Sequence, residues 1–390
     1  MTPSLYCCAL ANGSVRRRGK VWSFVVDLGP DPATGRRRQA RRSGFATKKA
    51  AEAALRDLAT AADAGTAVSR SRITVSQFLT DWLETIKPRV RETTWVSYRM
   101  VVERMTRQIG AVQLQSLTPL QVEGLYATLL EQGGAGGRAL APKTVRNCHI
   151  VLRRALADAE RLGLVTRNPA AAAKAVSAPR AEQKTWSSEE IQRFFDAVAG
   201  ERLSMAFVLL ATTGMRRGEV LGLRWEDVDL DGRALSIVQT LTTVSNSLHI
   251  GPPKTGKSRR RVSLDTVTFD ALRAHRARQL EERLAAADVW SNEGDLVFTD
   301  ELGGPVHPDR FSKSFDRIVR DAELPRIRLH DLRHSYATLA LKAGVHPKVV
   351  SERFGHSTIA ITLDLYSHVA QGLDADAAEL IASRIYGTTS

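Results

Sequence analysis

The chain is 390 residues long, enough for two or three domains that each bury a core of their own. It has no run of eighteen apolar residues, which excludes a membrane-spanning helix. The formal net charge is +14 at pH 7, divided as +8 in residues 1–70, +7 in residues 71–178 and −1 in residues 179–390. We therefore expect the first half of the chain to bind a polyanion.

The cysteines and the N-terminus indicate the compartment. Cys7, Cys8 and Cys148 have the spacing of neither a disulfide framework nor a metal site, which favours a reducing cytoplasm. The first ten residues have no basic segment before their short apolar patch, which argues against a secretory signal. Neither a membrane partner nor a metal is expected.

In residues 14–28 apolar and polar side chains alternate loosely, and many of these residues favour strands. A turn signal follows at residues 31–35. The Arg-rich stretch 36–43 predicts a returning strand, and Thr47 predicts the start of a helix. We expect a small sheet of two or three strands packed on one helix. Its arginines are clustered rather than interspersed with acids, so these are candidate DNA contacts: Arg16, Arg17, Arg18, Arg36, Arg37 and Arg38.

After a small, polar linker at residues 62–72, the sequence predicts an all-helical domain with four helices. The first ends at Pro88, the second opens at Thr93 or Thr94, the third follows the cap Thr118, and the fourth spans residues 143–162. The aromatic and aliphatic stripes form the core. On the exposed face of the fourth helix, two arginines are candidate phosphate contacts: Arg146 and Arg153.

Residues 168–180 lack large apolar side chains and predict an interdomain linker, after which the pattern changes to helices mixed with short strands. A buried helix at residues 205–212 ends at Gly214. Strands are expected at residues 235–239 and 261–264, with residues 251–257 in a loop between them. Further helices are expected near residues 332–340 and 347–354, and the run Arg259 to Arg261 is interpreted as solvated or as grazing a phosphate.

Six chemically active side chains recur in this last region. In chain order they are Arg216, Lys254, His330, Arg333, His356 and Tyr366. Guanidinium groups offer paired donors to phosphate oxygens, imidazoles exchange protons near neutral pH, and a phenol can act as a nucleophile. Such a set suits chemistry on a phosphodiester. Arg217, His334 and His368 adjoin these positions and are expected to be structural.

These six residues, in this order, resemble the active site of the tyrosine recombinases, the phage-type integrase family. The resemblance includes the Thr213–Val220 context of the first arginine, the lysine in a glycine-containing turn, His330–His334, Gly355-His356 and Leu363–His368. No catalytic position departs from the family pattern.

The resemblance implies a multidomain, mainly α chain. It places a small α+β arm-type DNA-binding domain in residues 1–65, an all-helical, SAM-like core-binding domain in residues 72–170, and a mixed, mainly α catalytic domain with a small β-sheet in residues 181–390. It also implies roles: Tyr366 attacks the scissile phosphate to leave a 3′-phosphotyrosine, and Arg216 and Arg333 neutralise the phosphate. Lys254 protonates the leaving oxygen, His330 assists Tyr366, His356 donates to the phosphate, and Glu219 orients the pocket.

The implied activity is site-specific integration and excision of a phage or mobile element by a homotetramer, without a cofactor. The implied partners are double-stranded DNA attachment sites of arm type and core type, an excisionase and a host DNA-bending protein, and the implied location is the cytoplasm of a bacterial host, at its nucleoid. The segment from Asp374 to Tyr386 has an apolar face that is expected to dock on a neighbouring protomer.

Three alternatives stay open on the sequence. A zinc peptidase would use His330 and His334, but it needs glutamate where Asp331 stands. A type IB topoisomerase shares the chemistry but has no need of the N-terminal domain. A non-catalytic DNA-binding protein on the same fold would not need all six residues.

Overall fold

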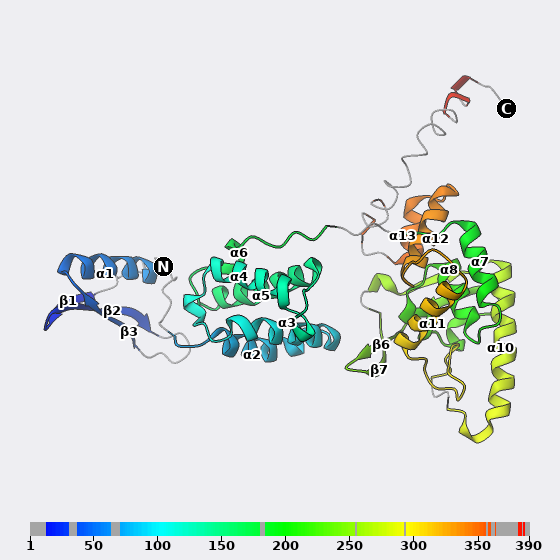
Figure 1. Cartoon of the computed structure of the whole chain (residues 1–390), viewed down its shortest axis with the longest axis horizontal. Coiled ribbons are helices and arrows are strands. Elements are labelled where there is room, and N and C mark those ends of the chain that lie inside the picture. The colour runs from blue at the N-terminus through cyan, green and yellow to red at the C-terminus, as the bar shows by residue number, and fades with distance from the viewer. Residues whose placement is uncertain are drawn as a thin grey trace, which may run out of the picture. The chain divides into compact units, whose positions relative to one another are not determined.

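The structure is a computed structural model that describes residues 13–30, 37–63, 71–179, 184–253, 256–291, 294–355, 358–359, 363, 381–383 and 385–386, without the side chains of residues 28–30, 38, 61–63 and 257. The chain divides into two compact units, Met1–Arg180 and Ala181–Ser390 (Figure 1). Among the helices described, none has the length and apolar character needed to cross a membrane.

The first unit begins with a three-stranded antiparallel sheet in the order β1-β2-β3, covered on one face by helix α1. The elements are β1 (Gly13–Arg18), β2 (Val21–Pro30), β3 (Arg37–Phe45) and α1 (Lys48–Asp63). Phe24 and Val26 of β2 pack with Leu58 of α1, and the hydroxyl of Thr47 accepts a hydrogen bond from the Ala50 N–H at 3.2 Å. The predicted sheet, returning strand and helix start are confirmed, while the turn at residues 31–35 lies outside the described residues.

A separate helical bundle follows. Its elements are α2 (Val75–Ile86), η1 (Lys87–Arg89), α3 (Glu92–Ile109), η2 (Leu114–Ser116), α4 (Pro119–Gln132), η3 (Ala135–Gly137), α5 (Pro142–Arg161) and α6 (Pro169–Ala172). Thr118 caps α4 as predicted, with its hydroxyl accepting from the Gln121 N–H. Helix α3 begins at Glu92, with Arg91 as its N-cap, one or two residues before the predicted start at Thr93 or Thr94.

The start of the predicted interdomain linker belongs to this bundle. The Asn168 side chain accepts hydrogen bonds from the N–H groups of Ala170 and Ala171 and so starts α6. Ala170 and Ala173 are buried in the bundle core together with the stripe of α5. Small side chains here serve close packing, which the sequence alone did not distinguish from a linker.

The second unit carries the candidate site. Its elements are α7 (Ser188–Val198), α8 (Ser204–Thr213), α9 (Arg217–Leu221), η4 (Trp225–Asp227), β4 (Val228–Asp229), β5 (Ala234–Ile237), β6 (Thr240–Val244), β7 (Ser247–Gly251), η5 (Gly256–Ser258), β8 (Arg260–Ser263), α10 (Thr266–Ala286), η6 (Ala287–Val289), α11 (Pro308–Asp321), α12 (Asp331–Lys342) and α13 (Pro347–Phe354). Figure 1 shows α12 and α13 next to α8 at one end of this unit.

An aromatic cluster joins α7, α8 and α11 in the core of this unit. The Phe207 and Phe311 rings stack with centroids 4.4 Å apart, and Phe194 and Phe315 meet edge to face at 5.5 Å. Close-packed aromatic rings fix the relative orientation of the helices that carry them. The C-terminal end of α8 is thereby held in a defined place, and the first catalytic motif begins there.

Two small sheets lie beside these helices. β5 pairs with β8 and with β4, and β6 pairs with β7 in a hairpin. The sequence predicted β5 and β8 but not the hairpin between them. β6 packs closely on α9: a Cβ atom at Gly218 would lie 2.5 Å from the Leu241 carbonyl oxygen, so only glycine allows this contact.

Candidate active site

The turn that presents Arg216 depends on a glycine. Helix α8 ends at Gly214, which has a φ of 66° in the left-handed region. A Cβ atom there would meet the Phe354 ring at the end of α13, 2.2 Å from its nearest atom. Gly214 therefore satisfies both the backbone conformation and the close approach of α13. Arg216 follows as the N-cap residue of α9.

Glu219 lies at the centre of the site. Its carboxylate is 3% exposed and accepts hydrogen bonds from the Arg216 N–H at 2.9 Å and from Arg216 Nη1 at 2.7 Å. Arg260 donates to both oxygens, at 2.9 and 3.2 Å. Burial opposes ionisation, but the hydrogen bonds and charges of Arg260 and Arg216 outweigh it and lower the pKa of Glu219. The carboxylate is thus charged at neutral pH.

Arg333 is buried in the first turn of α12 and connects two segments of the site. Its guanidinium donates to the Gly214 carbonyl oxygen and, at 2.7 Å, to the Phe354 carbonyl oxygen. The group also lies 4.1 Å from the centre of the Phe354 ring. Burial and the charge of Arg216 lower the pKa of Arg333 to about 9, which still leaves it charged at neutral pH.

These contacts bring together three guanidinium groups, those of Arg216, Arg260 and Arg333, around the single carboxylate of Glu219. The cluster therefore carries a net charge of +2 in a site that is partly shielded from water. Arg216 has the most exposed side chain of the four, at 39%. Such an arrangement favours an anion that approaches from the side of Arg216.

His330 directly precedes α12, and its ring meets His334 edge-on with centroids 5.2 Å apart. Protein atoms around the ring remove part of its water, which lowers the pKa of His330 to about 4, and the charges of His334 and Arg333 act in the same direction. Asp331 holds this turn, because its carboxylate accepts hydrogen bonds from the Arg328 N–H at 2.8 Å and from the Arg328 guanidinium.

We expect the imidazole of His330 to be half protonated near pH 4 and neutral at pH 7 in the free protein. A histidine with a reference pKa of about 6.5 would be half charged at pH 6.5. Because the unfolded chain binds this proton at higher pH than the folded one, protonation of His330 costs stability as the pH falls from 6.5 to 4. An NMR titration of the ring nitrogens, assigned by His330→Gln, should give a midpoint near 4; a midpoint above 6 would contradict the described environment.

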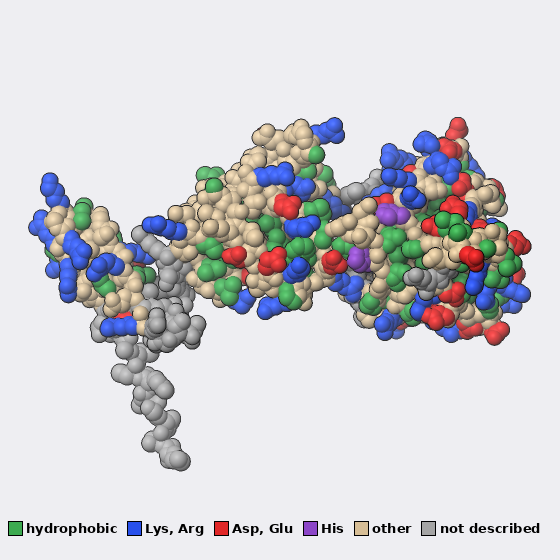
Figure 2. Space-filling model, turned by 90° about the horizontal axis from the view of Figure 1, so that it is seen from below, with side chains coloured by type: hydrophobic (Ala, Val, Ile, Leu, Met, Phe, Trp, Pro, Cys, Tyr) green, Lys and Arg blue, Asp and Glu red, His purple; other side chains and the backbone are tan. Residues whose placement is uncertain are grey.

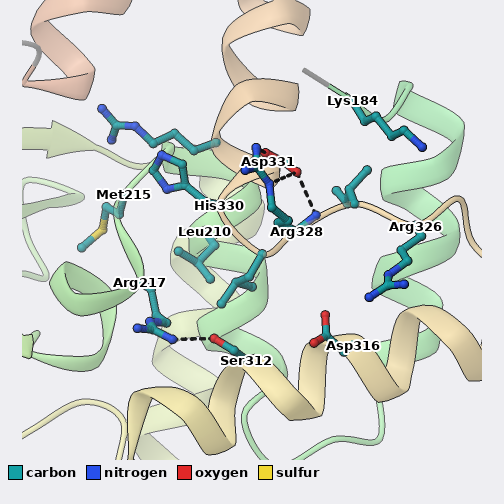
Figure 3. Close-up of a pocket in the computed structure, with 13 residues that line it drawn as sticks. Lys184, Leu210, Met215, Arg217, Ser312, Asp316, Arg326, Arg328, His330 and Asp331 are labelled. Carbon is teal, nitrogen blue, oxygen red and sulfur yellow. Dashed lines mark hydrogen bonds and ion pairs between the residues drawn. The ribbon is translucent and has the colours of Figure 1, made fainter. Parts of the chain in front are cut away.

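A pocket of about 740 Å³ opens beside His330 and Arg333 (Figure 3). Basic side chains dominate its rim: Lys184, Arg217, Arg326 and Arg328. The figure shows Arg326 and Asp316 on one side and Arg217 with Ser312 on the other. The pocket extends the positive character of the cluster across the surface next to His330.

The structure brings together four of the predicted site residues: Arg216, Glu219, His330 and Arg333. Lys254, His356 and Tyr366 lie outside the described residues, as does most of the segment from Asp374 to Tyr386. Arg217 donates to the Pro308 carbonyl oxygen and to the Ser312 hydroxyl, and His334 packs on His330, which supports the structural roles expected for both.

The interpretation of Arg260 as part of a solvated run is wrong. Its side chain is 7% exposed and pairs with Glu219, whereas Arg261 is exposed. The strand period could have revealed this, because Arg260 lies on the same side of β8 as Val262, which is buried. Three consecutive arginines instead suggest a surface patch.

The arginines predicted to contact DNA differ in exposure and in their partners. Arg16, Arg17 and Arg18 are exposed on β1, and Arg146 and Arg153 are exposed on α5. Arg37 forms an ion pair with Asp27. Arg36 and the side chain of Arg38 lie outside the described residues.

Comparison with known proteins covers the chain in three segments. A family model described as "Phage integrase family" matches residues 184–372. One described as "Arm DNA-binding domain" matches residues 14–62, and one described as "Phage integrase, N-terminal SAM-like domain" matches residues 74–130. The first match lies within the second unit, the second covers the N-terminal sheet with α1, and the third covers the first part of the helical bundle.

Relatives extend over most of the chain. A "Tyrosine recombinase XerC-like" protein of Caldanaerobacter subterraneus subsp. tengcongensis is 30% identical over 355 residues, which is 86% of this chain and 89% of that protein. An "Integrase" of Saccharopolyspora erythraea is 26% identical over 371 residues, or 81% of this chain and 83% of its own length. An "Integrase" of Mycobacterium phage L5 is 27% identical and covers 80% of both chains.

Solved structures share the fold. The Tn1549 transposon integrase in complex with a circular intermediate DNA has a TM-score of 0.66 at 20% identity, covering 80% of this chain and 99% of that one. The lambda integrase tetramer bound to a Holliday junction has a TM-score of 0.56 at 16% identity, covering 88% and 95%. With its arm sheet, helical bundle and catalytic unit, the chain belongs to the phage integrase family and is a tyrosine recombinase.

Proposed function

We propose that this protein joins and excises a phage or other mobile element at specific DNA sites, through a covalent 3′-phosphotyrosine at Tyr366. The observation that carries the proposal is the cluster of Arg216, Glu219, Arg260 and Arg333, whose net charge of +2 suits the scissile phosphate. Enzymes gain most from charges that are already in place where charge develops in the transition state. Arg216 and Arg333 are the groups assigned to this role.

In the proposed step the phenolic oxygen of Tyr366 attacks the phosphorus, and the bond from phosphorus to the 5′-oxygen breaks. His330 accepts the phenolic proton, for which its neutral form is required, and Lys254 gives a proton to the departing oxygen. His356 donates to a non-bridging oxygen. One phosphate ester replaces another, so a 5′-hydroxyl from a second duplex can reverse the step without nucleotide hydrolysis.

DNA binding is assigned to all three parts of the chain. The relatives of known structure include an integrase dimer bound to a core site and a tetramer bound to a Holliday junction. We propose the same order of assembly here: the arm domain on arm-type sites, the helical bundle and catalytic unit on core-type sites, and a homotetramer that exchanges strands. An excisionase and a host DNA-bending protein would set the direction, at the bacterial nucleoid.

The experiment that tests this function uses one plasmid with two candidate attachment sites. Incubation with the purified protein should yield recombinant circles whose junctions follow the predicted exchange, and EDTA should not prevent their formation. Relaxation of supercoils without recombinants would instead indicate a topoisomerase-like enzyme. Tight binding with neither product would indicate a DNA-binding protein that has kept the motif without the activity.

Of the described elements, α1 covers one face of the arm sheet, and the other face is the candidate for DNA contact. Strand pairing places Arg16 opposite Ser23 and Arg41 opposite Val25, on the face away from α1, whereas Arg42 pairs with Phe24 on the side that α1 covers. Figure 2 shows Lys and Arg side chains gathered over this part of the molecule. Arg16, Arg18 and Arg41 are thus best placed to contact phosphates in a groove.

We expect Arg16→Gln with Arg41→Gln to weaken binding to arm-type DNA by at least about tenfold and to reduce the salt slope by about two. The matched control is Arg17→Gln with Arg42→Gln, because these side chains alternate to the face that α1 covers. Binding isotherms at several salt concentrations measure both quantities. If both double variants lost the same DNA affinity, the face of the sheet on which an arginine lies would not determine whether it contacts DNA.

A further inference from the structure

Arg260 joins three segments that surround the candidate site. Its guanidinium donates to both carboxylate oxygens of Glu219 in α9, and its Nε donates to the Arg353 carbonyl oxygen near the end of α13 at 2.6 Å. A third contact, to the Ser258 carbonyl oxygen at 3.1 Å, holds the turn that leads into β8. With a side chain that is 7% exposed, Arg260 itself cannot reach a DNA strand over the surface.

Arg216 and Arg260 both donate hydrogen bonds to the Glu219 carboxylate, and this sharing determines how many donors Arg216 keeps for other partners. Arg260 takes the two-pronged position on the carboxylate, and the Arg216 side chain makes a single contact, from Nη1 at 2.7 Å. The other terminal nitrogen of Arg216, Nη2, lies 3.5 Å from the Gly355 carbonyl oxygen. This distance is at the upper limit for a hydrogen bond, so the contact is weak. Among the residues that the structure describes, the remaining donors of Arg216 have no other hydrogen-bond partner, so they can bind a phosphate.

Without Arg260, the carboxylate would be left with one guanidinium. Paired, parallel hydrogen bonds between arginine and a carboxylate are the strongest arrangement of these groups, so Glu219 would draw Arg216 into that pairing. Arg216 would then turn its donors away from the phosphate, and the end of α13 would lose its tether to β8. The cluster would also lose one of its positive charges.

We propose that Arg260 is a positioning residue for DNA cleavage: it occupies the Glu219 carboxylate so that Arg216 keeps its donors for the scissile phosphodiester. The inference rests on the proposed function. Arg260 acts through Arg216 and Glu219 and does not touch the reacting atoms. The alternative is that Arg260 only stabilises the fold, and the two roles predict different behaviour on a substrate without charge at the scissile position.

The test measures single-turnover formation of the covalent adduct at saturating DNA, on half-site duplexes whose scissile group is either a phosphodiester or a methylphosphonate. Arg260→Met should slow adduct formation on the phosphodiester by roughly 10- to 100-fold, with DNA affinity changed by less than about threefold. On the uncharged methylphosphonate the same variant should show a much smaller defect, because neutralisation by Arg216 is no longer needed.

Arg202→Met is the matched control. Arg202 is also paired in the same unit, with Glu282 and with the carbonyl oxygens of Thr299 and Asp300, although its side chain is 26% exposed; these contacts lie outside the site. Arg202→Met should leave the cleavage rate within about threefold, and its melting temperature shows the effect of removing a paired arginine outside the site. If Arg260→Met does not fold, Arg260→Lys takes its place, since a lysine can hold only one carboxylate oxygen well.

A second variant tests the coupling to Glu219. Adding Glu219→Gln to Arg260→Met removes the carboxylate charge that would draw Arg216 away, so the double variant should cleave the phosphodiester several-fold faster than Arg260→Met alone. The proposal is overturned if Arg260→Met cleaves at the wild-type rate, or if its defect is the same on both substrates and is not relieved in the double variant. Failure of the wild-type protein to form any adduct would instead refute the proposed function.

Discussion

Tyr366→Phe is expected to reduce covalent capture of DNA by roughly 10⁴-fold or more, because the phenolic oxygen is the only atom lost and it is the proposed nucleophile. DNA binding should stay close to the wild-type value, since the ring is retained. The measurement is adduct formation on a nicked attachment-site duplex, followed on a denaturing gel beside a binding isotherm of the same preparation.

The matched control for this variant is Tyr336→Phe. The Tyr336 ring packs on Phe354 with centroids 5.7 Å apart, close to the site, and phenylalanine preserves that contact. Tyr336→Phe should therefore form adduct at nearly the wild-type rate. Undiminished capture by Tyr366→Phe would assign the nucleophile to another residue.

Arg333→Lys is expected to slow cleavage by about 10²- to 10³-fold, the usual effect of losing one preorganised donor to developing negative charge. Lysine retains the charge, but a single ammonium group cannot hold the Gly214 and Phe354 carbonyl oxygens together as the guanidinium over the Phe354 ring does. The end of α13 would then separate from the turn that carries Arg216. Single-turnover cleavage and the melting temperature, measured together, distinguish this loss from general unfolding.

Arg217→Lys provides the comparison for Arg333→Lys. Arg217 adjoins the first catalytic motif, but its contacts are with Pro308 and Ser312 of α11. Its replacement should change the cleavage rate by no more than about threefold. If the two arginine variants lose activity to the same degree, Arg333 acts through the packing of its surroundings rather than through the phosphate.

Local signals in the sequence predicted most of the helices. Thr118 located the start of α4, because capping chemistry is decided by a few adjacent residues, and the helix expected near residues 347–354 is α13. The motif residues Arg216, His330 and Arg333 were assigned by resemblance, and the structure brings them together. Their joint position could not be derived from spacing, since it depends on the contact of α8 with α12.

The errors arose where the decisive contact is distant in sequence. The hairpin of β6 and β7 was missed because its turn uses Ser245 and Asn246, both with positive φ, in place of the common asparagine and glycine pair. Arg260 was assigned to the surface because its carboxylate partner, Glu219, lies 41 residues earlier. The period of β8 can indicate an inward side chain at Arg260, but it does not identify the distant carboxylate that compensates the buried charge.

If Tyr366 is the nucleophile, it carries the DNA in the trapped adduct, and the linked residue can be identified chemically. A nicked duplex from an attachment site is labelled on each side of the scissile position, incubated with the protein in EDTA, and the adduct is digested and sequenced by mass spectrometry. We expect one peptide with DNA joined through a 3′-phosphate to Tyr366. Linkage to another residue or through a 5′-phosphate, or no adduct on a site that recombines in cells, would contradict it.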